Sequence, residues 1–167
     1  MNDFRALEQF VSAGDIQDAI EELRRTHVVA LRQANFGARR GVVRTGFDLE
    51  AGGMSWRSLW LITHRPLRRA GVRRHPASAV VLAAWRGHGL VLLRGPEARR
   101  SVELAPLDAT GDAVVRFVSL APGTYFDTLA DDTPWHVLAF HSQPAPQLVR
   151  EDETQEGWSE KPEEADS

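Results

Sequence analysis

Residues 114–126 read VVRFVSLAPGTYF, a mostly apolar run that ends at Pro122-Gly123. Residues 73–89 read RRHPASAVVLAAWRGHG and have the same character, with a Val- and Ala-rich run between Pro76 and Gly87. β-Branched and aromatic residues favour strands, whereas Pro and Gly interrupt them. Both segments therefore predict short β-strands that are bounded by turns.

The same pattern recurs along most of the chain after Thr26. Eight segments are candidate strands: HVVALR (27–32), GVVRTGFDL (41–49), SWRSLWLITHRPL (55–67), SAVVLAAW (78–85), GLVLLRG (89–95), RSVELAP (100–106), AVVRFVSLA (113–121) and PWHVLAFHS (134–142). Because no helical pattern separates them, they predict an antiparallel sandwich or barrel and not a βαβ fold. WRGHGL (85–90) predicts a tight hairpin, since Gly87 and Gly89 can adopt positive φ.

The two ends of the chain differ from this middle part. DIQDAIEELRRT (15–26) has apolar residues at helical spacing, and a shorter pattern precedes Gly14, so we expect two short helices or one broken helix. Residues 151–167 hold eight acidic residues and Lys161, the only lysine, which is a composition typical of disorder. We therefore divide the chain into an N-terminal helical segment (1–30), a β-domain (31–149) and an acidic disordered tail (150–167).

Composition excludes several classes of protein. The chain has no cysteine, which rules out disulfides, thiolate nucleophiles and Cys-ligated metals. No segment reaches the roughly 18 apolar residues of a membrane span, and the start, MNDFRALEQF, has no signal-peptide pattern, so we expect a cytoplasmic protein without a membrane partner. Residues 1–150 contain 19 arginines and 15 acidic residues. This excess is too small for us to expect a nucleic acid as the partner.

The runs 73–89 and 114–126 resemble the two motifs of cupins, which are small jelly-roll barrels. Gly87 and Pro122-Gly123 match the structural positions of the cupin pattern. The resemblance implies a mainly β, antiparallel cupin-like jelly-roll barrel that is preceded here by short helices. Four positions would carry the cupin metal ligands, and this chain has Arg73, His75, Val80 and Phe126 there.

A single imidazole cannot supply the three or four N/O donors of a divalent-metal site. We therefore predict no metal and no cofactor, and no catalytic residue is identified. The alternative is a metal-dependent cupin enzyme, a dioxygenase, isomerase or lyase, that uses a non-standard cluster of His64, His75 and His141.

A ligand site is predicted where arginines meet tryptophans. HRPLRRAGVRRH (64–75) contains five arginines, whose guanidinium groups bind oxyanions in pairs of hydrogen bonds. Strand alternation would place Trp56 and Trp60 on one face, as a wall for an apolar or aromatic ligand. The predicted function is binding of a small anionic or aromatic molecule, or of a protein partner, in an accessory or regulatory role, and a homodimer is left open. The predicted ligand-binding residues are Trp56, Trp60, Arg73, Arg74, His75 and Phe126.

Overall fold

The computed structural model describes residues 3–33, 37–95, 98–154 and 157–163, without the side chains of residues 151–163. Two helices come first, α1 (Arg5–Ser12) and α2 (Gly14–Gln33), with Ala13 in an extended conformation between them. This confirms the N-terminal helices. The expectation of a strand at 27–32 is wrong, because α2 continues through it and buries His27 and Leu31, which lie four residues apart on one helix face.

The described residues form eleven strands in two sheets, and the named strands pair antiparallel throughout. The five-stranded sheet has the order β1 (Ala38–Ala51), β2 (Met54–His64), β9 (Trp135–His141), β4 (Val80–Arg86) and β7 (Phe117–Leu120). The six-stranded sheet has the order β11 (Gly157–Glu163), β10 (Leu148–Thr154), β3 (Arg73–Arg74), β8 (Tyr125–Ala130), β5 (Gly89–Arg94) and β6 (Arg99–Leu104). The predicted mainly β, antiparallel fold is confirmed, although the sheets remain separate and do not close into one barrel.

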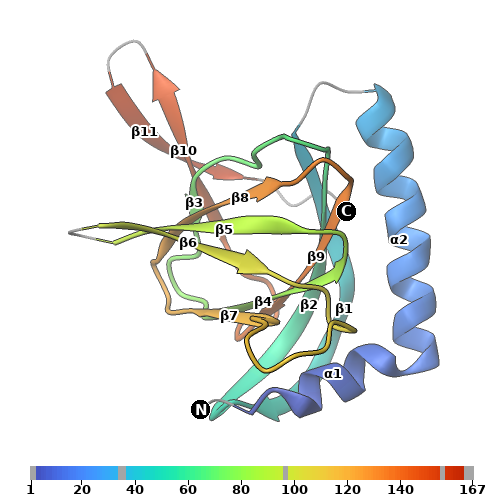
Figure 1. Cartoon of the computed structure of the whole chain (residues 1–167). Coiled ribbons are helices and arrows are strands. Elements are labelled where there is room, and N and C mark those ends of the chain that lie inside the picture. The colour runs from blue at the N-terminus through green and yellow to red at the C-terminus, as the bar shows by residue number, and fades with distance from the viewer. Residues whose placement is uncertain (1–2, 34–36, 96–97, 155–156, 164–167) are drawn as a thin grey trace.

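The molecule has three layers and two apolar clusters. One cluster fills the space between the two sheets and includes Trp60, Val80, Phe126 and Trp135. The other lies between the five-stranded sheet and the helices, which cover that sheet from outside (Figure 1). Every residue of β9 is buried, since its two faces belong to different clusters. No described helix is long and apolar enough to cross a membrane.

The segment WRGHGL is a crossing between the sheets and not a hairpin. β4 belongs to the five-stranded sheet and β5 to the six-stranded one. Gly87 has a φ of 84°, as expected, but Gly89 has a different role. A Cβ atom at Gly89 would lie 2.4 Å from the ring of Trp135 and 2.6 Å from the carbonyl oxygen of Leu129. Glycine is therefore required there for close packing of the chain as it enters the second sheet.

The acidic C-terminal segment also differs from the sequence-based expectation. Residues 148–154 and 157–163 pair as an antiparallel hairpin, and Val149 and Arg150 pair with β3. The hairpin thus extends the six-stranded sheet, where the composition had indicated disorder. Residues 155–156 and 164–167 of the expected tail lie outside the described residues.

Candidate functional site

The positions that match the cupin ligand pattern lie together between the sheets. Arg73 in β3 is opposite Phe126 in β8, and its guanidinium carbon is 4.5 Å from the centre of the phenylalanine ring. The His75 ring stacks on the same phenylalanine with 6.1 Å between ring centres. Val80 belongs to the same buried cluster as Phe126. The interior therefore brings together the four residues that the resemblance singled out.

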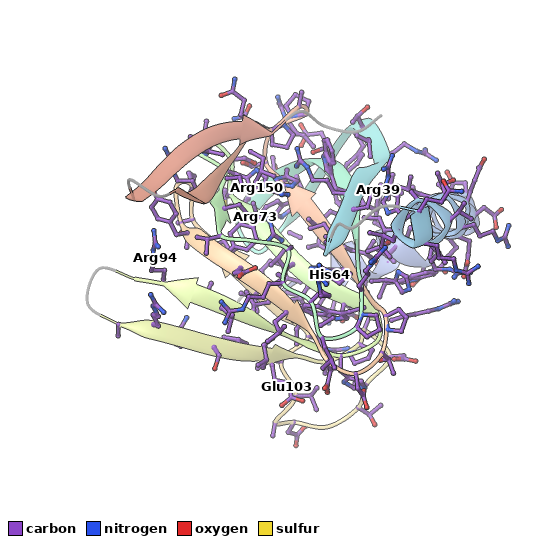
Figure 2. The ribbon with its side chains drawn as sticks, turned by 90° about the horizontal axis from the view of Figure 1, so that it is seen from above. Arg39, His64, Arg73, Arg94, Glu103 and Arg150 are labelled. Carbon is purple, nitrogen blue, oxygen red and sulfur yellow. The ribbon has the colours of Figure 1, made fainter. Side chains whose placement is uncertain are left out.

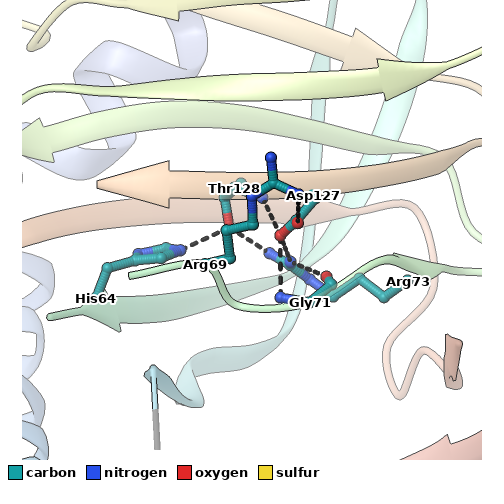
Figure 3. Close-up of polar contacts among 6 residues, drawn as sticks. All are labelled: His64, Arg69, Gly71, Arg73, Asp127 and Thr128. Carbon is teal, nitrogen blue, oxygen red and sulfur yellow. Dashed lines mark hydrogen bonds and ion pairs between the residues drawn. The ribbon is translucent and has the colours of Figure 1, made fainter. Parts of the chain in front are cut away.

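Arg73 is an internal structural cation. Its exposed fraction is 3%, and it donates hydrogen bonds to the Gly71 carbonyl oxygen (3.0 Å) and to Thr128 Oγ1 (2.9 Å) (Figure 3). Its Nη1 atom lies 3.9 Å from Asp127 Oδ1. Since these contacts hold the guanidinium inside the fold, Arg73 does not belong to a solvent-exposed arginine rim.

His64 takes part in the same buried network. Its Nε2 atom forms a 2.6 Å hydrogen bond with Thr128 Oγ1, the oxygen that also accepts from Arg73 (Figure 3). Burial lowers the pKa of His64 to about 3, and the positive charge of Arg73 acts in the same direction. His64 is therefore neutral near pH 7 and serves as a hydrogen-bonding core residue.

His75 and His141 form a second buried pair, with ring centres 4.4 Å apart. His75 Nδ1 donates to the carbonyl oxygen of Gln147 at 2.9 Å, which fixes its neutral tautomer. Burial lowers the pKa of His75 to about 3, and Arg73 and Arg40 lower it further, against the effect of the Gln147 carbonyl. The pKa of His141 lies well below its ordinary value, chiefly because of burial.

This interior does not fit a divalent metal. The structure brings His75 and His141 together, but His64 contacts Thr128 and Trp135 instead. Within the described ranges, no three histidine or carboxylate side chains are close enough to share an ion. The two imidazoles also lie in the field of Arg73 and Arg40, and positive charge opposes a cation. A cluster of His64, His75 and His141 is therefore not formed by the described residues.

The tryptophans do not line one wall. Trp56 belongs to the cluster under the helices and donates to the Ala51 carbonyl oxygen at 3.0 Å. Trp60 belongs to the cluster between the sheets and donates to Ser58 Oγ at 3.2 Å. Two register shifts in β1 add twist to the β1–β2 pair, which simple alternation does not capture. The prediction of a shared aromatic wall is thus wrong.

Arginines do gather at a pocket, but on the outer face of the six-stranded sheet. In β8, Phe126 faces the interior, so its neighbour Asp127 faces outward, and Leu92 of β5 lies opposite Asp127. A pocket of about 480 Å³ opens there. Its lining consists of Arg69, Val72, Leu92, Leu93, Arg94, Arg99, Arg100, Ser101 and Asp127, which we call the arginine pocket.

Among the described residues that line the arginine pocket, positive charges outnumber negative ones. Arg94 and Arg99 lie directly opposite each other in the β5–β6 pair, an arrangement of like charges that costs stability. Asp127 is the acidic residue in the described lining, and its carboxylate already accepts hydrogen bonds from the Gly71 and Thr128 amides (2.9 and 2.7 Å). The pocket therefore favours an anion.

Asp127 also connects the pocket to the interior. Its Oδ2 atom is 3.9 Å from Arg69 at the pocket, and its Oδ1 atom is 3.9 Å from buried Arg73 (Figure 3).

Of the predicted arginine segment 64–75, Arg69 and Val72 line this pocket, while Arg74 lies beside Tyr125, 5.6 Å from its ring centre. The sequence reasoning missed the arginines of β5 and β6. Their signal was LLRGPEARR, whose hairpin register would have placed Arg94 opposite Arg99.

Comparison with known proteins supports the fold. No family model matches the chain, and neither does any curated protein. Among solved structures, an oxalate oxidase in complex with the substrate analogue glycolate has a TM-score of 0.54 and 14% identity, over 70% of this chain and 56% of that one. The cysteine peptidase peruvianin-I from Thevetia peruviana latex has a TM-score of 0.52 and 15% identity, over 68% and 66%.

A third structure is an uncharacterised protein with a double-stranded β-helix domain from Klebsiella pneumoniae. It has a TM-score of 0.50 and 11% identity, over 70% of this chain and 86% of that one. By contrast, the match to the oxalate oxidase covers little more than half of that chain. At these identities the likeness shows the fold alone, which is the cupin or double-stranded β-helix fold.

Proposed function

We propose that this cupin-fold chain binds a small organic anion in the arginine pocket and acts as an accessory or regulatory binding protein. The observation that carries the proposal is that Arg69, Arg94 and Arg99 line one pocket, in which Asp127 is the carboxylate among the described residues. Guanidinium groups bind carboxylates and phosphates through paired, charge-assisted hydrogen bonds. An anion in the pocket would relieve the repulsion between Arg94 and Arg99.

The rest of the lining indicates the remainder of the ligand. Val72 and Leu92 supply apolar surface beside the arginines. The volume of about 480 Å³ lies within the roughly 300–1,000 Å³ range of small-molecule sites. A molecule with an apolar body and an acidic group would bury its body against Val72 and Leu92 and present its charge to the arginines.

Isothermal titration calorimetry with benzoate, succinate and inorganic phosphate tests this proposal, with neutral benzamide as the counterpart of benzoate. We expect at least one anion to bind and benzamide not to bind. Replacing Arg69 by Gln should weaken binding by up to about fivefold, since the Arg69 side chain is 64% exposed and an exposed ion pair contributes about 0.2–1 kcal/mol.

The matched control is Arg57→Gln, because Arg57 is an exposed arginine of β2 in the other sheet. This variant should bind the anion as the unaltered protein does. Equal binding by the Arg69→Gln and Arg57→Gln variants, or no binding of any of the three anions, would rule the arginine pocket out.

A further inference from the structure

Strand β6 forms one end of the six-stranded sheet. It pairs with β5 along one side, and no described strand pairs with its other side. The β5–β6 hairpin extends to the margin of the molecule (Figures 1 and 2). Arg99, Arg100, Ser101 and Glu103 are all exposed. An open strand edge is a template for pairing with another chain unless charges prevent it.

The charges on this edge have a particular order. Arg99, Ser101 and Glu103 alternate along β6 and therefore share the outer face of the sheet. Arg99 is opposite Arg94, and Glu103 is opposite Leu90, so neither has an oppositely charged residue across the β5–β6 pair. Among the described residues, the side chains of Arg99 and Glu103 form no hydrogen bond or ion pair.

We propose that β6 pairs antiparallel with β6 of a second copy of this chain, about a two-fold axis at Ser101. This axis is perpendicular to the sheet, so the outer faces of the two copies lie on the same side. Residues that are directly opposite each other must share a face, and alternate residues of β6 face opposite sides. The numbers of two paired residues must therefore add up to an even number. Centring on Ser101 places Arg99 opposite Glu103 of the second copy, and Glu103 opposite Arg99 of the second copy.

Other registers lose this complementarity. A two-fold axis at Arg100 would pair Arg99 with Ser101 of the second copy, and an axis at Val102 would pair Ser101 with Glu103. Within the described strand β6 (Arg99–Leu104), only the Ser101 register gives two symmetrical pairs of opposite charge, which stabilise a sheet where like charges destabilise it. The six-stranded sheets of two copies would then form one continuous sheet.

This inference goes beyond the proposed ligand site. Arg99 belongs to both, because it lies at the rim of the arginine pocket, but Glu103 is not in the lining of that pocket. The two proposals can therefore fail separately. Arg69→Gln should weaken anion binding and leave the association of the two copies unchanged.

Sedimentation equilibrium over roughly a hundredfold range of protein concentration tests the pairing, since mass action makes a dimer concentration-dependent. We expect a monomer–dimer equilibrium. The single variants Arg99→Glu and Glu103→Arg should each raise the dimer dissociation constant by at least about tenfold, because each replaces two opposite-charge pairs by like-charge pairs. The double variant R99E/E103R restores the opposite charges and should return the constant to within about threefold of the original value.

Glu22→Arg is the control for the change in net charge, because Glu22 is exposed on α2, on the other side of the molecule. It should leave the equilibrium unchanged. Thermal melts establish that each variant is folded, as expected for exposed positions. A chain that stays monomeric at every concentration, or a double variant as weak as the single ones, would overturn the proposal and show that the charges keep this edge unpaired.

Discussion

Arg73 lies over the face of Phe126, with its guanidinium carbon 4.5 Å from the ring centre, and both side chains are almost completely buried. In the cupin pattern these two positions would hold metal ligands. Here they hold a cation and an apolar ring, whose negative π-face attracts the cation. A cation–π contact and a set of hydrogen bonds thus occupy the part of the interior that a metal would require.

The first prediction concerns Arg73. Replacing it with Ala should lower the free energy of unfolding by about 3–5 kcal/mol, since it removes one member of a buried charged pair and leaves Asp127 and Thr128 with missing partners. Arg74→Ala, at the half-buried neighbour, should cost about 1 kcal/mol or less. Urea unfolding measures both, and equal losses would contradict an internal role for Arg73.

The second prediction concerns pH. Burial lowers the folded-state pKa of His64 and His75 to about 3, below the unfolded value of 6.5, so the unfolded chain binds more protons between these values. Stability is therefore fully present above about pH 6.5 and falls as the pH decreases toward 3. Each such histidine should contribute up to about 1.4 kcal/mol per pH unit.

Urea unfolding at pH 7.5, 6, 5 and 4.5 checks this dependence. His75→Asn deletes one buried imidazole, so the free energy of unfolding should decrease less steeply with falling pH. The variant should also be less stable than the unaltered protein at every pH. His88→Gln, at an exposed residue of the β4–β5 connection, leaves the buried histidines in place and is the control. A free energy of unfolding that stays constant from pH 7 to 4.5 would contradict the assigned burial.

The third prediction concerns metals. Adding manganese, nickel or zinc, or removing metal with a chelator, should leave the melting temperature unchanged, since His75 and His141 have no third donor among the described residues. The triple variant Arg73→His, Val80→Glu and Phe126→His restores the cupin ligand types and should gain a metal-dependent rise in melting temperature. Purified protein that contains one equivalent of a divalent ion and loses stability with chelator would contradict this reading and favour a metal-dependent enzyme.

The fourth prediction concerns Gly89. Replacing it with Ala should destabilise the protein by about 2 kcal/mol or more, because the new methyl group meets the Trp135 ring and a backbone oxygen. Gly14→Ala is the matched control, since a Cβ atom there has no neighbour within 4 Å and Ala is a better helix former. It should stabilise by about 0.5 kcal/mol. Thermal or urea unfolding measures the stability of both variants. If Gly89→Ala changed stability as little as Gly14→Ala does, the contact between Gly89 and Trp135 would not be tight.

Much of the fold could be predicted because strand alternation and turn residues are local signals. Seven of the eight expected strands are present, and the cupin motif positions Arg73, His75 and Phe126 meet as the resemblance implied. The segment HVVALR is helical although Val28 and Val29 favour a strand, because tertiary packing of His27 and Leu31 selects the helix.

The site was harder to predict because it depends on non-local register. Trp56 and Trp60 are an even number of residues apart in β2, yet they belong to different clusters. Two register shifts interrupt the pairing of β1 with this strand. The arginine pocket combines Arg69 with residues of the β5–β6 hairpin that are 23 to 32 positions away in the sequence. Only the order of strands brings these segments to one surface, and composition carries no such information.

The position of β9 also constrains how the chain reaches its native state. β9 spans Trp135–His141, yet it lies between β2 and β4 at the centre of the five-stranded sheet. During synthesis, the ribosome releases β2 and β4 long before their common neighbour exists. The nascent chain therefore has to hold two hydrophobic strands without their central partner until residues 135–141 emerge. During this period long-range pairing is slow and the chain is exposed to aggregation.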